Sequence, residues 1–211
     1  NVTYDYVYGG SGENTASSNT ITLRNGSTGY SLEGGQSTGG NADGNTVTVT
    51  DSTVYNMTMG GMVAGGNDMT GHANGSTVTL DNSSSNSVYG GFSLGTDASS
   101  NKVELKNGSS AGTVYGGKAA NASTGSANGN TAILTDSAAT SDVYGGFVQG
   151  TGTASENKVT IENSTVERAN MVVAGFTNDA GGDIRDNTLN LSGNTSINAE
   201  FTIAGYHYAG G

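Results

Sequence analysis

Apolar and polar residues alternate in short segments that recur along the whole chain. The clearest segment covers residues 45–49, Asn-Thr-Val-Thr-Val, in which the third and fifth residues are apolar and the second and fourth are polar. Alternation with a period of two is typical of a β-strand that buries one face. We therefore expect the third and fifth residues of each segment to lie inside the protein. Equivalent segments begin at Asn19, Asn45, Ser76, Asn101, Asn130, Asn157 and Asn187.

A second segment ends in two small residues, as in Val-Tyr-Gly-Gly-Phe at residues 88–92. It occurs eight times, and successive copies are 25 to 30 residues apart. A repeat of this length indicates a solenoid, in which each unit buries its apolar face only by stacking on its neighbours. The second small residue of the eight copies is Gly10, Gly35, Gly61, Gly91, Gly117, Gly146, Gly175 and Gly205.

Turn residues separate the two segments in each repeat. Asn25, Asp51 and their equivalents come six residues after the start of the first strand, and Asn, Asp and Gly tolerate the positive φ of a sharp corner. The chain also contains no proline, which an interior strand paired on both sides excludes. We therefore predict an all-β fold, a parallel β-helix of about eight rungs with 25–30 residues per rung. The general preference of parallel crossovers predicts a right-handed coil. A single solenoid domain is expected over residues 1–211, cut from a longer repetitive rod, because neither end carries an obvious cap.

The asparagine that opens most of the first segments has the same parity as the buried residues. Asparagines stacked at an inner corner can link their side-chain amides from rung to rung. The alternative is that asparagine only tolerates the turn geometry. The predicted ladder consists of Asn19, Asn45, Asn101, Asn130, Asn157 and Asn187.

The tyrosines of the second segment are the main candidates for binding. We expect Val88, Gly90 and Phe92 to share the inner face, which leaves Tyr89 and its equivalents Tyr115 and Tyr144 in an outward column. Such a column would be an amphipathic stripe suited to contact with a protein or a glycan. If the tyrosines face inward instead, they are part of the core.

Charge and composition narrow the possible partners. Seven Lys and Arg against 18 Asp and Glu give a formal net charge of −11. Nucleic acid is an unfavourable partner, because binding to phosphates needs a basic track. The two histidines, His72 and His207, have no partner that the sequence places beside them, and the chain has no cysteine. We expect no metal site, no cofactor and no catalytic residues.

The repeated Asn-Thr-Val-Thr-Leu, Asn/Asp-Gly/Ser-Ser and Val-Tyr-Gly-Gly-Phe elements resemble the passenger repeats of bacterial type V autotransporters, and the resemblance covers nearly the whole chain. It implies a right-handed β-helix, export through an outer-membrane β-barrel, a location at the bacterial surface, and a role in adhesion or aggregation. The passenger motif is architectural, so the resemblance assigns no functional residue.

Three functions follow from these patterns. The first is a non-catalytic surface adhesin that binds a host or bacterial surface protein or glycan by repeated weak contacts. The second is a spacer or a self-assembling filament, with association through uncapped ends of the solenoid. The third is a polysaccharide-cleaving β-helix enzyme, for which Asp51, Asp81 and Asp136 would line one edge from a shared repeat position.

Overall fold

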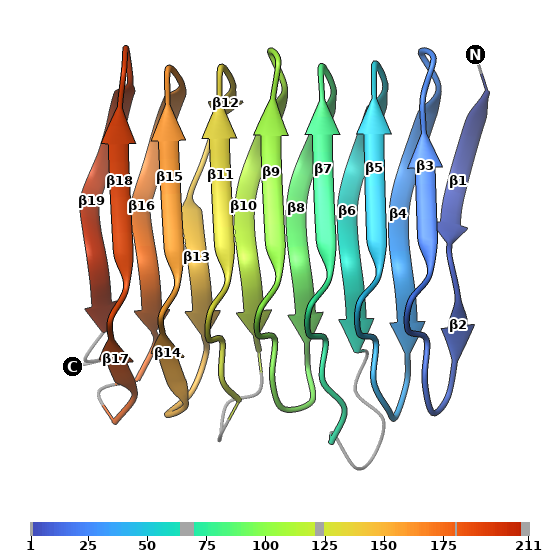
Figure 1. Cartoon of the computed structure of the whole chain (residues 1–211), viewed down its shortest axis with the longest axis horizontal. Helices are drawn as coiled ribbons and strands as arrows, with labels where there is room; N and C mark the ends of the chain where they lie inside the picture. Colours follow the sequence, from blue (N-terminus) through green and yellow to red (C-terminus); the bar gives the residue numbers. More distant parts are fainter. Residues whose placement is uncertain (1, 64–69, 121–124, 180, 208–211) are drawn as a thin grey trace.

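The chain forms a β-solenoid of about seven turns in which parallel strands are stacked along one axis (Figure 1). The computed structural model describes residues 2–63, 70–120, 125–179 and 181–207, and these contain no helix. The first and last described strands, β1 (Thr3–Tyr8) and β19 (Ser196–His207), lie at opposite ends of the stack. The predicted all-β parallel solenoid is therefore confirmed.

The first segments of the repeats form a seven-stranded parallel sheet. Val47 pairs with Val78, and Val78 pairs with Val103, and none of the three is accessible to solvent. Equivalent residues therefore lie directly over one another, as the alternating pattern predicts. The strands are β3 (Thr20–Leu23), β5 (Thr46–Thr50), β7 (Thr77–Asp81), β9 (Lys102–Lys106), β11 (Thr131–Thr135), β15 (Lys158–Glu162) and β18 (Thr188–Ser192).

The second segments form a ten-stranded parallel sheet with eight rungs, because two rungs are each divided into two strands. This sheet has eight rungs, one for each glycine pair, and the seven-stranded sheet has seven. The chain therefore completes about seven turns. A further two-stranded sheet joins β14 (Thr153–Ser155) and β17 (Asp183–Arg185). The ten strands are β1, β2 (Ser11–Gly12), β4 (Thr28–Ser37), β6 (Thr53–Val63), β8 (Ser84–Ser93), β10 (Ser110–Ala119), β12 (Ala138–Ala139), β13 (Val143–Val148), β16 (Thr165–Thr177) and β19.

The interior contains a main core and smaller alanine-rich clusters. Valine, leucine and isoleucine from the two large sheets fill the main core. On the other side of the glycine pairs, Ala98, Ala127 and Ala154 pack with Ala119 and Val148 in a separate cluster. The alanines recur once per rung where the variable loops return to the coil, a column that the sequence analysis did not identify. Small side chains suit this narrow part of the coil.

The asparagine ladder separates these two parts of the interior. Asn101 donates from its backbone nitrogen and from Nδ2 to Asn130 Oδ1, at 2.9 and 3.1 Å. Asn130 donates in the same way to Asn157, and Asn157 to Asn187. Asn45, Asn101, Asn130 and Asn157 are buried, so these asparagines line the interior rather than merely occupy a turn.

The glycine pairs are required because the ladder lies against them. A Cβ on Gly117 would meet the carboxamide of Asn130 and the carbonyl oxygen of Ala98. Gly91 has the same relation to Asn101, and Gly146 to Asn157. The glycine therefore recurs in each repeat because the asparagine carboxamide packs directly against it.

One prediction about the second segment is wrong. Phe92 does not share the inner face with Val88. Its ring lies beside Tyr89, with centroids 5.5 Å apart. Both glycines of the pair are buried, so the strict alternation of faces is interrupted between Tyr89 and Phe92. The inward residue after the pair is Ser93, and both aromatic side chains lie on the outer face of the sheet.

We expect Ser76→Asn to stabilise the fold. Ser76 interrupts the ladder, and its short hydroxyl accepts the Asn45 backbone N–H but leaves the buried Asn45 Nδ2 without a partner. A carboxamide at position 76 supplies that partner and stabilises the protein by about 1 kcal/mol, measured by denaturant unfolding. The matched change Asn157→Ser removes the acceptor of Asn130 Nδ2 and lowers stability. A variant Ser76→Asn no more stable than the parent would contradict this account.

We expect Gly117→Ala to destabilise the fold by about 2 kcal/mol or more, because the new methyl group overpacks the ladder. Gly181→Ala is the control. Its Cβ would make only ordinary contacts, 3.4 Å from Asp179 Oδ1 and 3.5 Å from Thr151 Cγ2, and Gly181 is exposed. The control changes the unfolding free energy by less than about 0.5 kcal/mol. Equal effects of the two substitutions would show that the ladder does not set the need for glycine.

Candidate interaction surface

Two columns of side chains run along the outer face of the ten-stranded sheet. The tyrosine column precedes the glycine pairs and the phenylalanine column follows them, and each contributes one residue per rung. In rung order the tyrosine column is Tyr8, Glu33, Met59, Tyr89, Tyr115, Tyr144, Val173 and Ile203. The phenylalanine column is Ser11, Gln36, Met62, Phe92, Lys118, Phe147, Phe176 and Tyr206. We call the part from Met59 and Met62 onward the aromatic face.

The three predicted tyrosines are brought together on this face. The ring centroids of Tyr89 and Tyr115 are 5.0 Å apart with an interplanar angle of 4°, and those of Tyr115 and Tyr144 are 5.0 Å apart at 7°. Val88 and its equivalents face the main core, so the alternation of the strand directs the tyrosines to the other side of the sheet. The stack is nevertheless well packed, since Tyr144 is only 5% exposed.

The phenylalanine column closes this layer from the side. Phe147 lies edge-on to Tyr115 and Tyr144, at 5.7 and 5.2 Å between centroids. Phe176 stacks on Phe147 at 4.9 Å. Burial raises the pKa of Tyr115 and Tyr144 well above the ordinary value, so both phenols stay protonated at physiological pH.

The arrangement of the rings decides what the face can bind. Both faces of the Tyr115 ring are turned towards Tyr89 and Tyr144, and Phe147 covers one edge. Ring edges therefore dominate the outer surface. A sugar that stacks on an aromatic side chain needs a free ring face, whereas apolar protein side chains pack against edges and faces alike. The geometry favours contact with a protein over contact with a glycan.

Lys118 is the one charged residue in the aromatic face. Its Nζ lies 4.8 Å from the centroid of the Tyr115 ring and 5.2 Å from that of Phe147. The rings of Phe92 and Tyr89 follow at 5.7 and 5.9 Å. Burial lowers the pKa of the Lys118 ammonium group. Among the described residues, Lys118 has no acidic partner within ion-pair distance.

An apolar pocket opens next to Phe92, on the side away from Lys118. It has a volume of about 220 Å³ and is lined by Met57, Met59, Met62, Tyr89 and Phe92. Methionine side chains are flexible and polarisable, so they adapt to apolar groups of different shapes. The pocket and Lys118 together give the aromatic face a local feature that its other rungs do not share.

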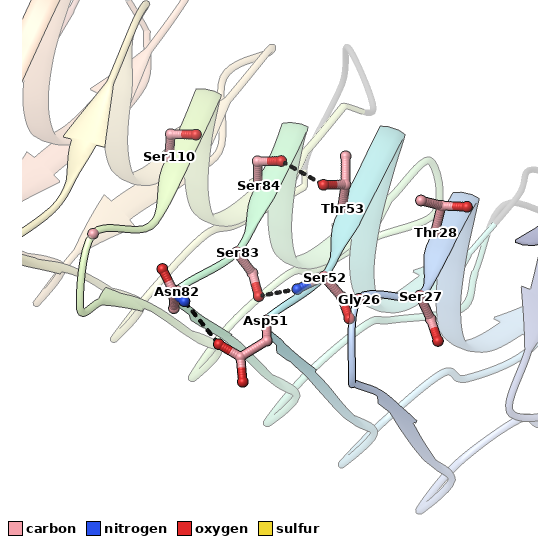
Figure 2. Close-up of a pocket in the computed structure, with 11 residues that line it drawn as sticks. Gly26, Ser27, Thr28, Asp51, Ser52, Thr53, Asn82, Ser83, Ser84 and Ser110 are labelled. Atoms are coloured by element: carbon pink, nitrogen blue, oxygen red, sulfur yellow. Dashed lines mark hydrogen bonds between the residues drawn. The ribbon is translucent and has the colours of Figure 1, made fainter. Parts of the chain in front are cut away.

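A second, polar groove follows the corner between the two large sheets (Figure 2). It has a volume of about 360 Å³, and hydroxyl groups from several rungs line it. Ser83 accepts a hydrogen bond from the backbone N–H of Ser52 at 3.1 Å and donates to the carbonyl of Asp81 at 2.8 Å. The buried serines at this corner are therefore a second structural ladder, which sequence analysis identified only as a turn. The corner residues that precede the serines have positive φ, as predicted: Asn25, Asp51, Asn82, Asn107, Asp136 and Asn163.

The three aspartates considered for a polysaccharide-cleaving site, Asp51, Asp81 and Asp136, do not form one row. Asp81 pairs with Thr50 inside the sheet, whereas Asp51 lies at the corner and accepts a hydrogen bond from Asn82 Nδ2 at 2.7 Å. The prediction that Asp81 shares a repeat position with Asp51 and Asp136 is therefore wrong. Among the residues that the structure describes, no three His, Cys, Asp or Glu side chains form a group that could hold a metal.

The two histidines lie in different parts of the coil: His72 in a loop, and His207 directly after Tyr206 of the phenylalanine column. His72 Nδ1 lies 2.9 Å from Asp43 Oδ1, and the same oxygen accepts the backbone N–H of Asn74 at 2.8 Å. This contact ties successive loops together on the return side of the coil. His207 ends β19.

Glu33 is a buried carboxylate on the rung before the aromatic face, between Tyr8 and Met59 in the tyrosine column. Its Oε2 has no hydrogen-bond partner, and burial raises the pKa of the carboxyl group. The folded state thus favours the protonated form. The contribution of the Glu33 carboxyl group to the unfolding free energy is therefore greatest at a pH below its pKa in the unfolded state. This contribution is lost as the pH rises through the higher pKa of the folded state.

We therefore expect Glu33→Gln to raise the unfolding free energy at pH 7 by about 1–3 kcal/mol, because the neutral amide avoids burying an unpaired charge. The difference should shrink as the pH is lowered and vanish where Glu33 is protonated in both states. Denaturant unfolding between acid and neutral pH measures it, and Gln36→Glu, in the partly exposed neighbouring position, is a control for total charge. A stability difference independent of pH would show that ionisation of Glu33 is not its cause.

No helix in the described part of the chain is long and apolar enough to span a membrane. No known family, curated protein or solved structure matches the chain.

Proposed function

We propose that this chain is a non-catalytic adhesive rod, a segment of a bacterial surface protein of the autotransporter passenger kind, secreted and displayed outside the cell. The single observation that carries the proposal is the aromatic face, in which mainly apolar side chains from successive rungs, several of them partly exposed, form one layer on the outer side of the sheet. Contiguous apolar surface outside the core is typical of sites that bind other proteins.

The repeat makes such a surface suitable for multivalent contact. Each rung adds two side chains to the face, and the partner bound at one rung is held close to the next. Weak individual contacts then combine into firm attachment. The partner we propose is a protein on a host or bacterial surface, because the rings present edges rather than free faces for stacking on sugars.

A spacer rod is the second candidate, and the regular ladders favour it. Continuous hydrogen bonding through Asn101, Asn130, Asn157 and Asn187 ties four successive rungs together. A spacer needs this rigidity but has no use for an apolar outer face. The two functions therefore differ in what happens when that face is made polar.

The test is the triple variant Met62→Thr, Phe92→Thr and Phe147→Thr, attached to beads and applied to panels of cultured animal cells and bacteria. These three side chains are partly exposed, and threonine suits an outward strand position. The stacked tyrosines are less suitable, because removing the buried Tyr144 would also disturb packing. We expect beads with the parent protein to adhere, and the variant to retain at least about tenfold fewer beads, since multivalent binding amplifies each lost contact.

The matched control is Ile133→Thr, which makes the same kind of change at a partly exposed, outward position of the seven-stranded sheet. It should adhere like the parent. Unfolding curves establish that each variant is folded, and Phe92→Thr alone replaces the triple variant if that variant is unstable. A parent protein that adheres to no cell, or a folded variant that adheres as well as the parent, would favour the spacer.

A further inference from the structure

The apolar pocket and Lys118 lie close enough on the aromatic face for one ligand to contact both. The pocket is bounded by Met59 and Met62 on one rung and by Tyr89 and Phe92 on the next. Lys118 occupies the rung after Phe92. Its ammonium group is closest to the Tyr115 ring of its own rung and lies between the rings of Phe92 and Phe147.

The described residues supply no acidic partner within ion-pair distance for the charge of Lys118. The ammonium group sits over aromatic rings, which attract a cation, and Lys118 is partly exposed, so its N–H groups are accessible to a ligand. Within the described ranges, Lys102, Lys106 and Arg185 each lie within ion-pair distance of an acidic side chain, whereas Lys118 does not. A carboxylate of a ligand could form an ion pair with this ammonium group, in addition to the contacts that Lys118 makes with the aromatic rings.

The spacing between the two features matches an extended peptide. The centre of the pocket is one and a half rungs from Lys118, or about 7 Å at roughly 4.8 Å per rung. Alternate side chains of an extended strand point the same way and are also about 7 Å apart. One side chain can therefore fill the pocket while the next but one reaches the ammonium group.

We propose that the aromatic face docks an extended segment of a partner protein, in which an apolar side chain and a carboxylate are separated by one residue. The apolar side chain enters the methionine-lined pocket, and the carboxylate pairs with Lys118. This inference rests on the proposed adhesive function and names the chemistry that its partner must present.

The net charge of the protein limits the kind of segment that fits. At −11 the chain repels strongly acidic partners at long range, whereas Lys118 attracts a carboxylate only locally. The favoured segment therefore carries one acidic residue in a neutral, apolar context. A run of acidic residues would be repelled before it reached the pocket.

The probe is the peptide acetyl-Gly-Phe-Ser-Asp-Gly-amide, titrated into protein labelled on its methionine methyl groups and followed by NMR at millimolar peptide. We expect the methyl signals of Met57, Met59 and Met62 to shift, while Met171, towards the far end of the sheet, stays unchanged. Replacing the aspartate of the peptide by asparagine should weaken binding about fivefold, which is the upper range for a partly exposed ion pair. Replacing its phenylalanine by alanine should abolish the shifts.

Two protein variants assign the effect to Lys118. Lys118→Met keeps an apolar stem of similar length but removes the charge, and it should bind the aspartate and asparagine peptides equally. Lys118→Arg keeps the charge and should retain the preference for aspartate. The double-mutant cycle between Lys118 and the peptide aspartate then isolates their coupling.

Several results would overturn this proposal. They are the absence of methionine shifts at millimolar peptide, equal binding of the aspartate and asparagine peptides to the parent protein, or a preference that persists in Lys118→Met. The outcome is separable from that of the adhesion experiment. Loss of adhesion in the triple variant together with no peptide binding would uphold the adhesive function and refute the partner chemistry.

Discussion

The close contact between the asparagine ladder and the glycine pairs is the constraint on which the rest of the structure depends. The carboxamides of Asn101, Asn130 and Asn157 occupy the space that a side chain at the second glycine would need. The same carboxamides link neighbouring rungs through buried hydrogen bonds, which are costly to leave unmade. Register, rung spacing and the direction of the outer side chains all follow from this contact. A small hydrophobic core then suffices, because the rungs from Asn101 to Asn187 repeat the same hydrogen-bonded arrangement.

Much of this architecture could be predicted from the sequence because it depends on periodicity. Alternation at period two identifies Val47 and Val49 as buried, and the interval between glycine pairs places equivalent residues on successive rungs. The parity of Asn45 places it on the inner side with those valines. Each of these inferences needs only a strand, a repeat and the parallel stacking of identical units. Repetition thus replaces the long-range information that a globular fold would require.

The remaining features depend on three-dimensional detail that the pattern does not contain. The glycine pair interrupts the alternation, so Phe92 and Phe147 lie outside beside the tyrosines instead of inside with Val88. The serine ladder at the corner reads as an ordinary turn in the sequence, since its hydrogen bonds run between residues about 27 to 31 apart. The unpaired carboxylate of Glu33 depends on how its neighbours on adjacent rungs cover it. Each case concerns lateral packing between columns, whereas periodicity specifies only the contents of one column.

The strand pairing of the coil does not depend on which side chains occupy the outward columns, and this affects how the sequence of such a protein can evolve. A single outward column holds Glu33, Met59, Tyr115 and Val173 at equivalent positions of strands that keep the same parallel pairing. The scaffold therefore tolerates acidic, thioether, aromatic and branched side chains at one geometrically fixed site. Binding preferences can diverge one rung at a time under selection, while the coil that carries them remains unaltered.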